Sequence, residues 1–281
     1  MKAALFDYSR PDEVGAALSL LSGSPGAKAM GGSQSLGPML NLRLARPGVV
    51  VDVSGIPGLR TVTQEADSIR VGAAVTHAEI EDGIHPLLRG TPLQKIAAGI
   101  AYRSVRNRGT LGGSLAHADP AADWLVTAVA FGASLEIVSP AGSRLVDADA
   151  FMIGAYTTVL AENELIAAVR FPVASPAMRW GYYKYCRKTG EFAEASCAAR
   201  FDSSTGMARI AIGALSGAPR LLPSLAAAVA REGQTACTQD AIAHAVAEAM
   251  PDHDAVDRKL HAVAVRRCLA QLLGAEESTW R

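Results

Sequence analysis

Two short segments combine paired glycines with small hydroxyl residues, and this combination is the one in the sequence best suited to bind an anionic ligand. The first reads GGSQS over residues 31–35 and the second reads TLGGS over residues 110–114. Glycine permits positive φ angles and a close approach of a ligand to the backbone, and successive amides in such a turn form an anion-binding concavity. If the two segments face one another, they would hold a diphosphate from two sides. Further donors would be the hydroxyls of Ser33, Ser35, Thr110 and Ser114.

Each segment by itself is weak evidence for a ligand, because neither matches the G-x-G-x-x-G or P-loop pattern and a lone glycine pair is commonly a tight turn. Arg106 and Arg108 flank the second segment, and either a phosphate contact or surface ion pairing fits them. His117 has no second ligand at metal spacing, so a local hydrogen bond accounts for it better than a metal ion does. His77 is expected at the start of a helix, with a functional role as the alternative. No serine lies in a G-x-S-x-G setting, so a hydrolase triad is not expected.

The composition argues against several classes of function. Lys and Arg together number 27, as do Asp and Glu, so the net charge of the 281 residues is zero and no general attraction to nucleic acid or anionic membranes is expected. No apolar run reaches the roughly 18 residues of a membrane-spanning helix, and the N-terminal segment does not resemble a signal peptide. The four cysteines form no C-x-x-C pair, which argues against an iron–sulfur or zinc site and favours reduced thiols in a cytoplasmic protein.

The first glycine segment falls within a small α/β lobe that we expect to span residues 1–55. Apolar residues at helical spacing predict a helix over 12–21 and another over 35–45. A short strand over 27–30 runs into the glycine pair, and the valine-rich stretch 48–56 predicts a buried strand.

A second unit is expected over residues 56–176 and a third over residues 177–281. In the second unit the pattern predicts hairpins over 61–73 and 133–151, helices over 86–101 and 120–132, and a strand over 163–173. In the third unit it predicts antiparallel strands, followed from Leu221 by three Ala-rich helical segments separated near Gly233 and Pro251.

Four blocks in this order resemble one family. They are GGSQSLGPMLNLRLARP, VVVDVSGIPGLR, RNRGTLGGSLAHADPAAD and YKYCRKTGEFAEASCA. Together they resemble the FAD-binding medium subunits of molybdenum hydroxylases, the xanthine dehydrogenase and carbon monoxide dehydrogenase type, over essentially the whole chain. The resemblance implies an α+β fold: a two-lobed FAD-binding domain of the vanillyl-alcohol-oxidase/PCMH type, then a C-terminal domain with a three-stranded antiparallel sheet and a helical bundle.

The resemblance also implies which residues contact FAD, and it implies no catalytic acid–base residue and no metal ligand in this chain. The implied contacts are Ala29, Met30, Gly31, Gly32, Ser33, Gln34, Ser35, Leu36, Thr110, Leu111, Gly112, Gly113, Ser114, Asp123, Leu165, Ile166 and Lys184. Two departures from the family pattern stand out. Ser33 replaces a usual glycine, which would strain a left-handed turn unless Gly31 shifts the turn by one residue. Tyr102 replaces a residue that is usually small, near the expected place of the isoalloxazine.

The function implied by the resemblance is electron transfer. Substrate would be hydroxylated at a molybdenum–pterin centre in a large subunit, and electrons would pass through [2Fe–2S] clusters of a small subunit to the FAD bound here. An external acceptor, NAD, oxygen or a quinone, would then receive them, within a dimer of heterotrimers. The alternatives are a stand-alone FAD-dependent oxidase of the same broad fold and a non-catalytic protein that has lost FAD.

Overall fold

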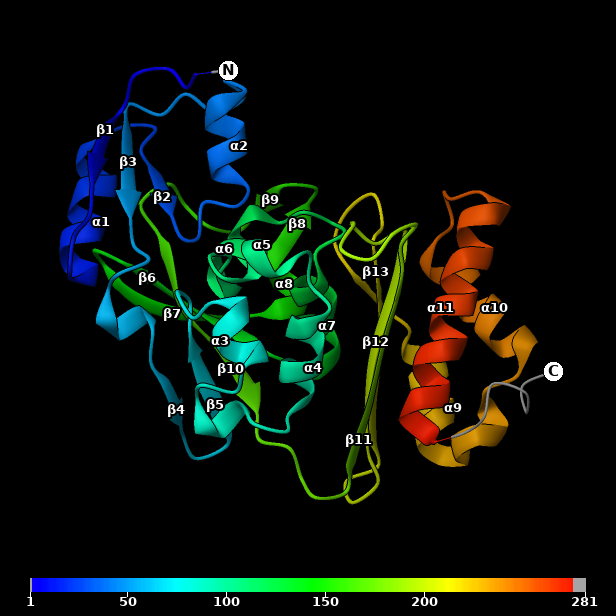
Figure 1. Cartoon of the computed structure of the whole chain (residues 1–281). Helices are drawn as coiled ribbons and strands as arrows, with labels where there is room; N and C mark the ends of the chain where they lie inside the picture. The colour runs from blue at the N-terminus through cyan, green and yellow to red at the C-terminus, as the bar shows by residue number, and fades with distance from the viewer. Residues whose placement is uncertain (1, 275–281) are drawn as a thin grey trace.

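The computed structural model describes residues 2–274, in which three larger sheets follow one another along the chain and a fourth sheet has only two short strands. Figure 1 shows the N-terminal lobe at one end, a central lobe with helices over its sheet, and a C-terminal sheet backed by helices at the other end. The expected third unit runs to residue 281, of which residues 275–281 lie outside the described part.

The N-terminal lobe is a three-stranded parallel sheet with the order β1-β3-β2. Its elements are β1 (Asp7–Ser9), α1 (Val14–Gly23), β2 (Lys28–Met30), α2 (Leu36–Asn41) and β3 (Val49–Asp52). The valine run of β3 is central and buried, as its sequence predicts. The sequence pattern missed β1, which has three residues and little burial. The helix expected over 35–45 ends early, and Arg43 just beyond it has a φ of 60°.

The central lobe contains a five-stranded antiparallel sheet with the order β4-β5-β10-β6-β7. Its strands are β4 (Val62–Gln64), β5 (Ser68–Gly72), β6 (Ser134–Ser139), β7 (Gly142–Asp147) and β10 (Leu165–Pro172). Both expected hairpins are confirmed, since β4 pairs with β5 and β6 with β7. A short second sheet pairs β8 (Met152–Gly154) with β9 (Thr157–Thr158).

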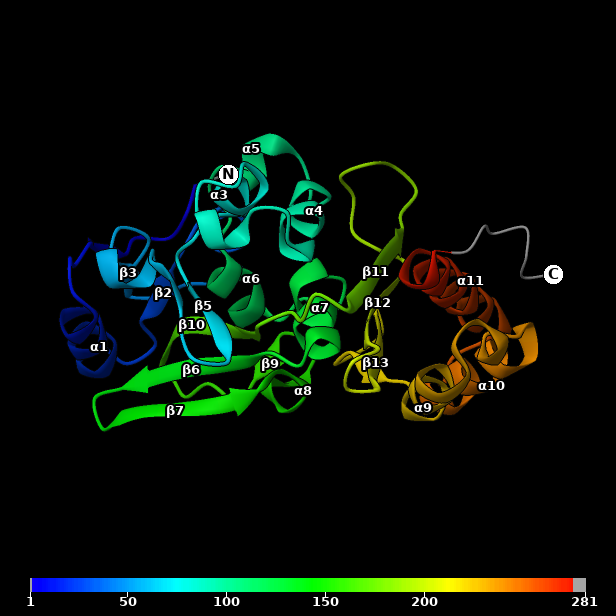
Figure 2. The same ribbon diagram turned by 90° about the horizontal axis from the view of Figure 1, so that it is seen from below.

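Helices cover one face of the five-stranded sheet, as Figure 2 shows for α6 and α7 above β6 and β10. The helices of this lobe as a whole are η1 (Pro57–Leu59), α3 (His77–Glu81), η2 (Pro86–Leu88), α4 (Pro92–Ala98), α5 (Arg103–Arg106), α6 (Leu111–His117), α7 (Asp123–Phe131) and α8 (Ala148–Phe151). The single helix expected over 86–101 is wrong. It is divided where Gly90 adopts a φ of 69° and Pro92 starts a new helix.

Two further differences concern the second glycine segment and the helix after it. Residues 110–114 do not form a separate loop, because Thr110 caps α6 and the glycines lie in its first turn. Helix α7 begins at Asp123 and not at Pro120, and every residue from Trp124 to Phe131 is buried.

The C-terminal part is an antiparallel sheet with helices on its outer face. Its elements are β11 (Met178–Tyr185), β12 (Ala195–Asp202), β13 (Met207–Gly213), β14 (Arg220–Leu221), α9 (Pro223–Glu232), η3 (Gly233–Ala236), α10 (Gln239–Ala249) and α11 (Ala255–Leu273). The sheet has a fourth, two-residue strand, β14, beside the three strands expected. Helix α7 packs on β12 and β13 while α11 packs on β11 and β12, so α7 belongs to the central core and also supports this sheet.

Within residues 2–274, no helix is both long and apolar enough to span a bilayer. The four cysteines are free thiols, and Cys197, Cys237 and Cys268 are buried.

Candidate cofactor site

The first glycine segment directly follows β2, at the edge where the three parallel strands of the N-terminal sheet have their carboxyl ends. Ligands of open α/β sheets bind beyond this edge. Among the described residues, the backbone amides of residues 32–35 have no hydrogen-bond acceptor. The segment is ordered by its own contacts, since the side-chain amide Nε2 of Gln34 donates to the carbonyl of Gly32 over 2.9 Å. This ordered turn therefore contains four adjacent backbone donors that have no acceptor among the described residues.

Ser33 carries the strain that its replacement of glycine implied. Its φ is 62°, in the left-handed region, whereas Gly31 has no positive φ. The turn is therefore not shifted by one residue, and Ser33 bears a conformational cost of roughly 1–2 kcal/mol relative to an ordinary φ. Strain of this kind persists where the surroundings fix the backbone, and it gathers at functional sites.

The second glycine segment uses its amides differently. The Leu111 amide donates to the carbonyl of Val75 over 3.0 Å, and the Gly112 amide donates to the carbonyl of Ala73 over 2.8 Å. The amide of Gly113 donates to the hydroxyl of Thr110 over 3.1 Å. The expectation that both segments offer unpaired amides is therefore wrong for these three, because the protein itself supplies their acceptors.

The two segments lie against one another, and their glycines make this contact possible. A Cβ on Gly32 would lie 1.8 Å from the carbonyl oxygen of Arg108, and one on Gly31 would lie 2.7 Å from the hydroxyl of Thr110. A Cβ on Gly112 would lie 2.4 Å from that of Ala73. Bare backbone is thus required at Gly31 and Gly32 by the contact between the two lobes, and at Gly112 by packing within the central lobe. Only the amides that remain open are available to a ligand.

The structure brings Asp123 and Lys184 together from separate parts of the chain. Lys184 Nζ lies 2.7 Å from Asp123 Oδ1, and both side chains are nearly buried. The hydroxyl of Tyr182 donates to the same carboxylate oxygen. Burial, with the charge of Asp123 added, raises the pKa of Tyr182 well above its usual range, so the phenol stays a donor. Tyr182 was not singled out from the sequence. Its position two residues before Lys184 on the same strand was a signal, because residues two apart on a strand share a face.

The remaining expected contacts fall on the elements around this site. Ala29 and Met30 end β2, Leu36 starts α2, and Ser114 lies in α6. Leu165 and Ile166 start β10, where each is 6% exposed. Leu165 packs into the core next to the N-terminal lobe, and Ile166 packs into the core of the central lobe.

The two arginines beside the second segment have different roles. Arg106 pairs with both carboxylate oxygens of Glu81, at 2.7 and 2.9 Å, and donates to the carbonyls of Ile100 and Ala101. Its guanidinium is therefore engaged inside the protein. Arg108 is exposed, and its side chain has no hydrogen bond or ion pair with the described residues.

A buried carboxylate lies at the carboxyl edge of the N-terminal sheet. Asp52 is 3% exposed and accepts hydrogen bonds from the Tyr8 hydroxyl and the Ser54 amide. Burial alone would raise the pKa of Asp52, but these hydrogen bonds outweigh it and the net pKa is lowered. The hydrogen bond to Asp52 raises the pKa of Tyr8, while the positive charges of Arg10 and Arg108 act in the opposite direction. Both arginines thus exert their charge at this edge.

The other candidates are placed as follows. The His117 ring contacts the Tyr156 ring at a centroid separation of 5.3 Å. Tyr102 is 51% exposed and lies beside Gly190 in the loop between β11 and β12. In the part of the chain that the structure describes, no group of three His, Cys, Asp or Glu side chains is arranged to hold a metal ion.

Comparison with known proteins decides the family. A family model described as the FAD binding domain in molybdopterin dehydrogenase matches residues 4–174. The chain belongs to this family. It is 37% identical over 228 residues to the nicotine 6-hydroxylase medium subunit of Paenarthrobacter nicotinovorans, covering 79% of each chain. It is 38% identical to the carbon monoxide dehydrogenase medium chain of Hydrogenophaga pseudoflava, covering 69% of this chain and 68% of that one.

Solved structures agree over nearly the full length. A structure of carbon monoxide dehydrogenase from Hydrogenophaga pseudoflava matches with a TM-score of 0.89 and 31% identity, covering 98% of this chain and 99% of that one. Quinoline 2-oxidoreductase from Pseudomonas putida 86 matches with a TM-score of 0.85 at 31% identity, covering 98% of this chain and 99% of that one. The chain is therefore an FAD-binding medium subunit of a molybdenum hydroxylase with the expected α+β, PCMH-type fold. Its cofactor is FAD, and molybdenum and iron–sulfur centres belong to other subunits of such oxidoreductases.

Proposed function

We propose that this medium subunit holds FAD between its first two lobes and carries electrons from [2Fe–2S] clusters of a small partner subunit to an external acceptor. The observation that supports this most directly is the row of open amides over residues 32–35, at the carboxyl edge of a parallel sheet and pressed against the start of α6. A row of unpartnered donors with nearby positive charge fits a pyrophosphate.

The residues present fit the cofactor in the following way. The amides of residues 32–35 would bind the pyrophosphate, with the guanidinium of Arg108 balancing its charge. The second segment, from Thr110 to Ser114, would form the opposite wall, with Ser114 as the hydroxyl donor. We propose the whole expected set as the lining of this site: residues 29–36, residues 110–114, Asp123, Leu165, Ile166 and Lys184. The site would lie between units 1–55 and 56–176, with unit 177–281 supplying Lys184.

The cluster of Asp123, Lys184 and Tyr182 ties the C-terminal sheet to the start of α7. The positive charge of Lys184 already balances the negative charge of Asp123. The Asp123 carboxylate could therefore orient a polar group of the bound cofactor by hydrogen bonding, without placing a net charge beside it. When bound, the flavin supplies redox chemistry, and the protein contributes placement and electrostatics. None of this chain's residues needs to act as an acid or base in the transfer.

The partners in this proposal are a small [2Fe–2S] subunit and a large molybdenum–pterin subunit, in a cytoplasmic dimer of heterotrimers. Curated relatives are named as medium subunits of such complexes, including those that act on nicotine and carbon monoxide. The large subunit would determine which substrate is oxidised, and NAD, oxygen or a quinone would be the final electron acceptor.

The test is to express the chain alone and together with the genes beside its own. We expect the chain alone to bind one FAD, seen as flavin absorption after gel filtration, and to show no iron–sulfur EPR signal after reduction with dithionite. We expect the co-expressed complex to reduce its flavin when substrate is added. A chain that binds no FAD from excess cofactor would contradict the proposal. Substrate oxidation by the chain alone would favour a stand-alone oxidase instead.

A further inference from the structure

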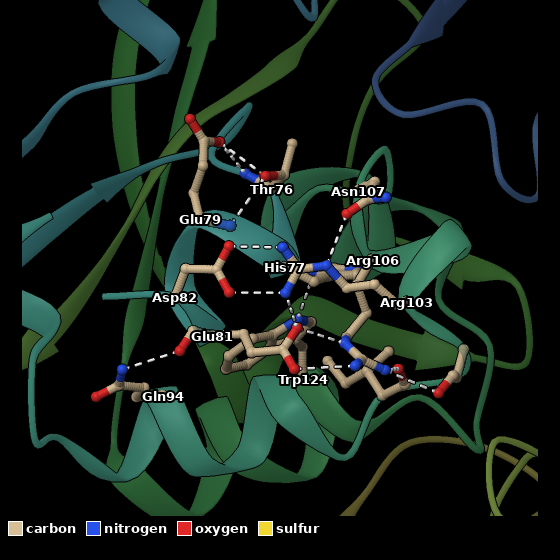
Figure 3. A network of polar contacts seen from close by, with 12 residues as sticks. Thr76, His77, Glu79, Glu81, Asp82, Gln94, Arg103, Arg106, Asn107 and Trp124 are labelled. Atoms are coloured by element: carbon tan, nitrogen blue, oxygen red, sulfur yellow. Dashed lines mark hydrogen bonds and ion pairs between the residues drawn. The ribbon is translucent and has the colours of Figure 1, made fainter. Parts of the chain in front are cut away.

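His77 is a buried polar side chain between the two structural parts that would hold FAD in the central lobe. It is the first residue of α3 and is 4% exposed. On one side it meets the residue before the second glycine segment, and on the other it meets α7 next to Asp123. Figure 3 shows His77 beside Trp124, within a network of polar side chains that surrounds α3.

Three contacts define the position of His77. Its backbone amide donates to the carbonyl of Gly109 over 2.9 Å. Its Nδ1 accepts a hydrogen bond from Nε1 of Trp124 over 3.1 Å. The ring fills the space where a side chain at Gly109 would stand, since a Cβ there would lie 2.8 Å from Cδ2 and 2.9 Å from Nε2. One imidazole therefore touches the entry to α6 and the first turn of α7.

The helix that carries His77 is itself held in place. Thr76 and Glu79 form a reciprocal capping box at its start, and Arg60 pairs with Glu79. Thr76 also forms an isolated β-bridge with Thr110, the cap of α6. At the other end of α3, Glu81 receives the two bonds from Arg106 (Figure 3). Because these contacts hold α3 in place, the ring of His77 is held too, and it can position Gly109 and Trp124.

The direction of the hydrogen bond requires a neutral ring. An indole N–H only donates, so Nδ1 of His77 must be the unprotonated acceptor. Burial lowers the pKa of His77 to about 4, and the charge of Arg106 acts in the same direction, so the ring is neutral near pH 7. A phenylalanine would fill a similar volume but would leave the buried indole N–H without a partner, at a cost that exceeds the gain from most single contacts.

We propose that His77 is a positioning residue for the cofactor, which sets the separation between the start of α6 and the start of α7. These two helix starts carry Thr110 to Ser114 and Asp123, so the inference rests on the proposed function of the site. An extended ligand makes all its contacts at once only if the groups that bind it are correctly spaced. A displacement of one binding group by about 1 Å therefore weakens binding of the whole ligand. His77 would thus act on FAD without touching it.

The test compares three variants in the full chain. His77→Phe removes the acceptor and keeps the volume, whereas His77→Asn keeps an oxygen acceptor near the position of Nδ1. His261→Phe is the matched control, because His261 is 2% exposed and makes two ring hydrogen bonds in the C-terminal part, to the carbonyls of Asp257 in α11 and Gly213 in β13. The measurements are the FAD dissociation constant, the midpoint potential of the bound flavin, and the melting temperature without FAD.

We expect His77→Phe to raise the FAD dissociation constant about tenfold or more and to shift the flavin potential, and His77→Asn to restore most of both. His261→Phe should lower the melting temperature and leave the FAD dissociation constant unchanged. If His77→Phe does not fold, Trp124→Phe removes the same hydrogen bond from its donor side and should weaken FAD binding in the same direction.

Two outcomes would overturn the inference. One is an FAD affinity of folded His77→Phe equal to that of the wild type, and the other is a loss that His77→Asn fails to restore. Failure of the proposed function looks different, because the wild-type chain would then bind no FAD at all.

Discussion

The two glycine segments have nearly the same composition, but the structure gives them different tasks. Over residues 32–35 the amides have no acceptor among the described residues, and the backbone includes a strained serine. At the start of α6 the amides of residues 111–113 are bonded within the protein, and the glycines are there because Ala73 and Thr110 leave no room for a Cβ. We therefore propose that the first segment contacts the cofactor and that the second forms the opposite wall of the site.

The difference follows from what precedes each segment. The first follows a strand that ends, so the next amides have no ladder partner. The second lies beside the chain that continues from β5, whose carbonyls at Ala73 and Val75 accept its amides. Two similar motifs can therefore differ in the number of free amide donors, because only the second lies beside a chain segment whose carbonyls are available as acceptors.

The largest effect is expected from Gly32→Ala. Its Cβ would lie 1.8 Å from the carbonyl oxygen of Arg108, so the two lobes must separate before it fits. We expect FAD affinity to fall by roughly 100-fold or more, about 3 kcal/mol. Gly15→Ala is the control in the same lobe, since a Cβ there meets nothing within 4 Å. Flavin retention by Gly32→Ala at the wild-type level would show that the lobes do not meet in this way.

Acidification should remove the contribution of His77 to the free energy of unfolding before that of Asp52. The pKa of His77 is about 4 in the folded chain against 6.5 in the unfolded one, so the unfolded chain takes up the proton first. The free energy of unfolding should then fall as the pH drops from 6.5 to 4, by up to about 3 kcal/mol. The pKa of Asp52 is lowered from 3.8, so its contribution is lost only at lower pH.

The measurement for this prediction is urea unfolding of the wild type and of His77→Phe between pH 7 and pH 4. The wild type should lose more stability over that interval than the variant, which lacks the titrating ring. Parallel pH profiles for the two proteins would contradict the assignment.

A smaller effect is expected from Arg108→Gln, which removes the exposed charge next to the open amides. FAD affinity should fall by about tenfold at low ionic strength, and the difference should shrink as salt is added, because an exposed charge is screened. Arg179→Gln, another exposed arginine, is the control. FMN, which lacks the pyrophosphate, should bind equally to both variants. A loss independent of salt would point to packing and not to charge.

The smallest effect is expected from Ser33→Gly. Glycine accepts a φ of 62° without strain, but it has more conformational freedom to lose on folding. The net gain in the free energy of unfolding should be below about 1 kcal/mol, with FAD binding close to that of the wild type. Ser33→Ala keeps the strain and should show no gain, so equal melting temperatures for the two variants would argue against strain at this turn.

Much of the secondary structure was predictable from local patterns. The valine run of β3, the β4–β5 and β6–β7 hairpins and the C-terminal helices were all recognised, because alternation and helical spacing are local properties. The break of the expected helix at Gly90 was not recognised, since its φ depends on how the chain turns there. Asp123 and Lys184 were each expected at the site, but their ion pair joins residues far apart in the sequence.

The sequence by itself determined the family, the cofactor class and the positions of both glycine segments, because ordered motifs and short-range spacing are written in the residues. Only the tertiary structure decided which amides stay open, that Arg106 is paired while the Arg108 side chain has no partner among residues 2–274, and that His77 lies between the second segment and α7. The physical reason is that a hydrogen-bond donor is free or paired according to its neighbours in space. Those neighbours come from strands and helices that the sequence order does not place side by side.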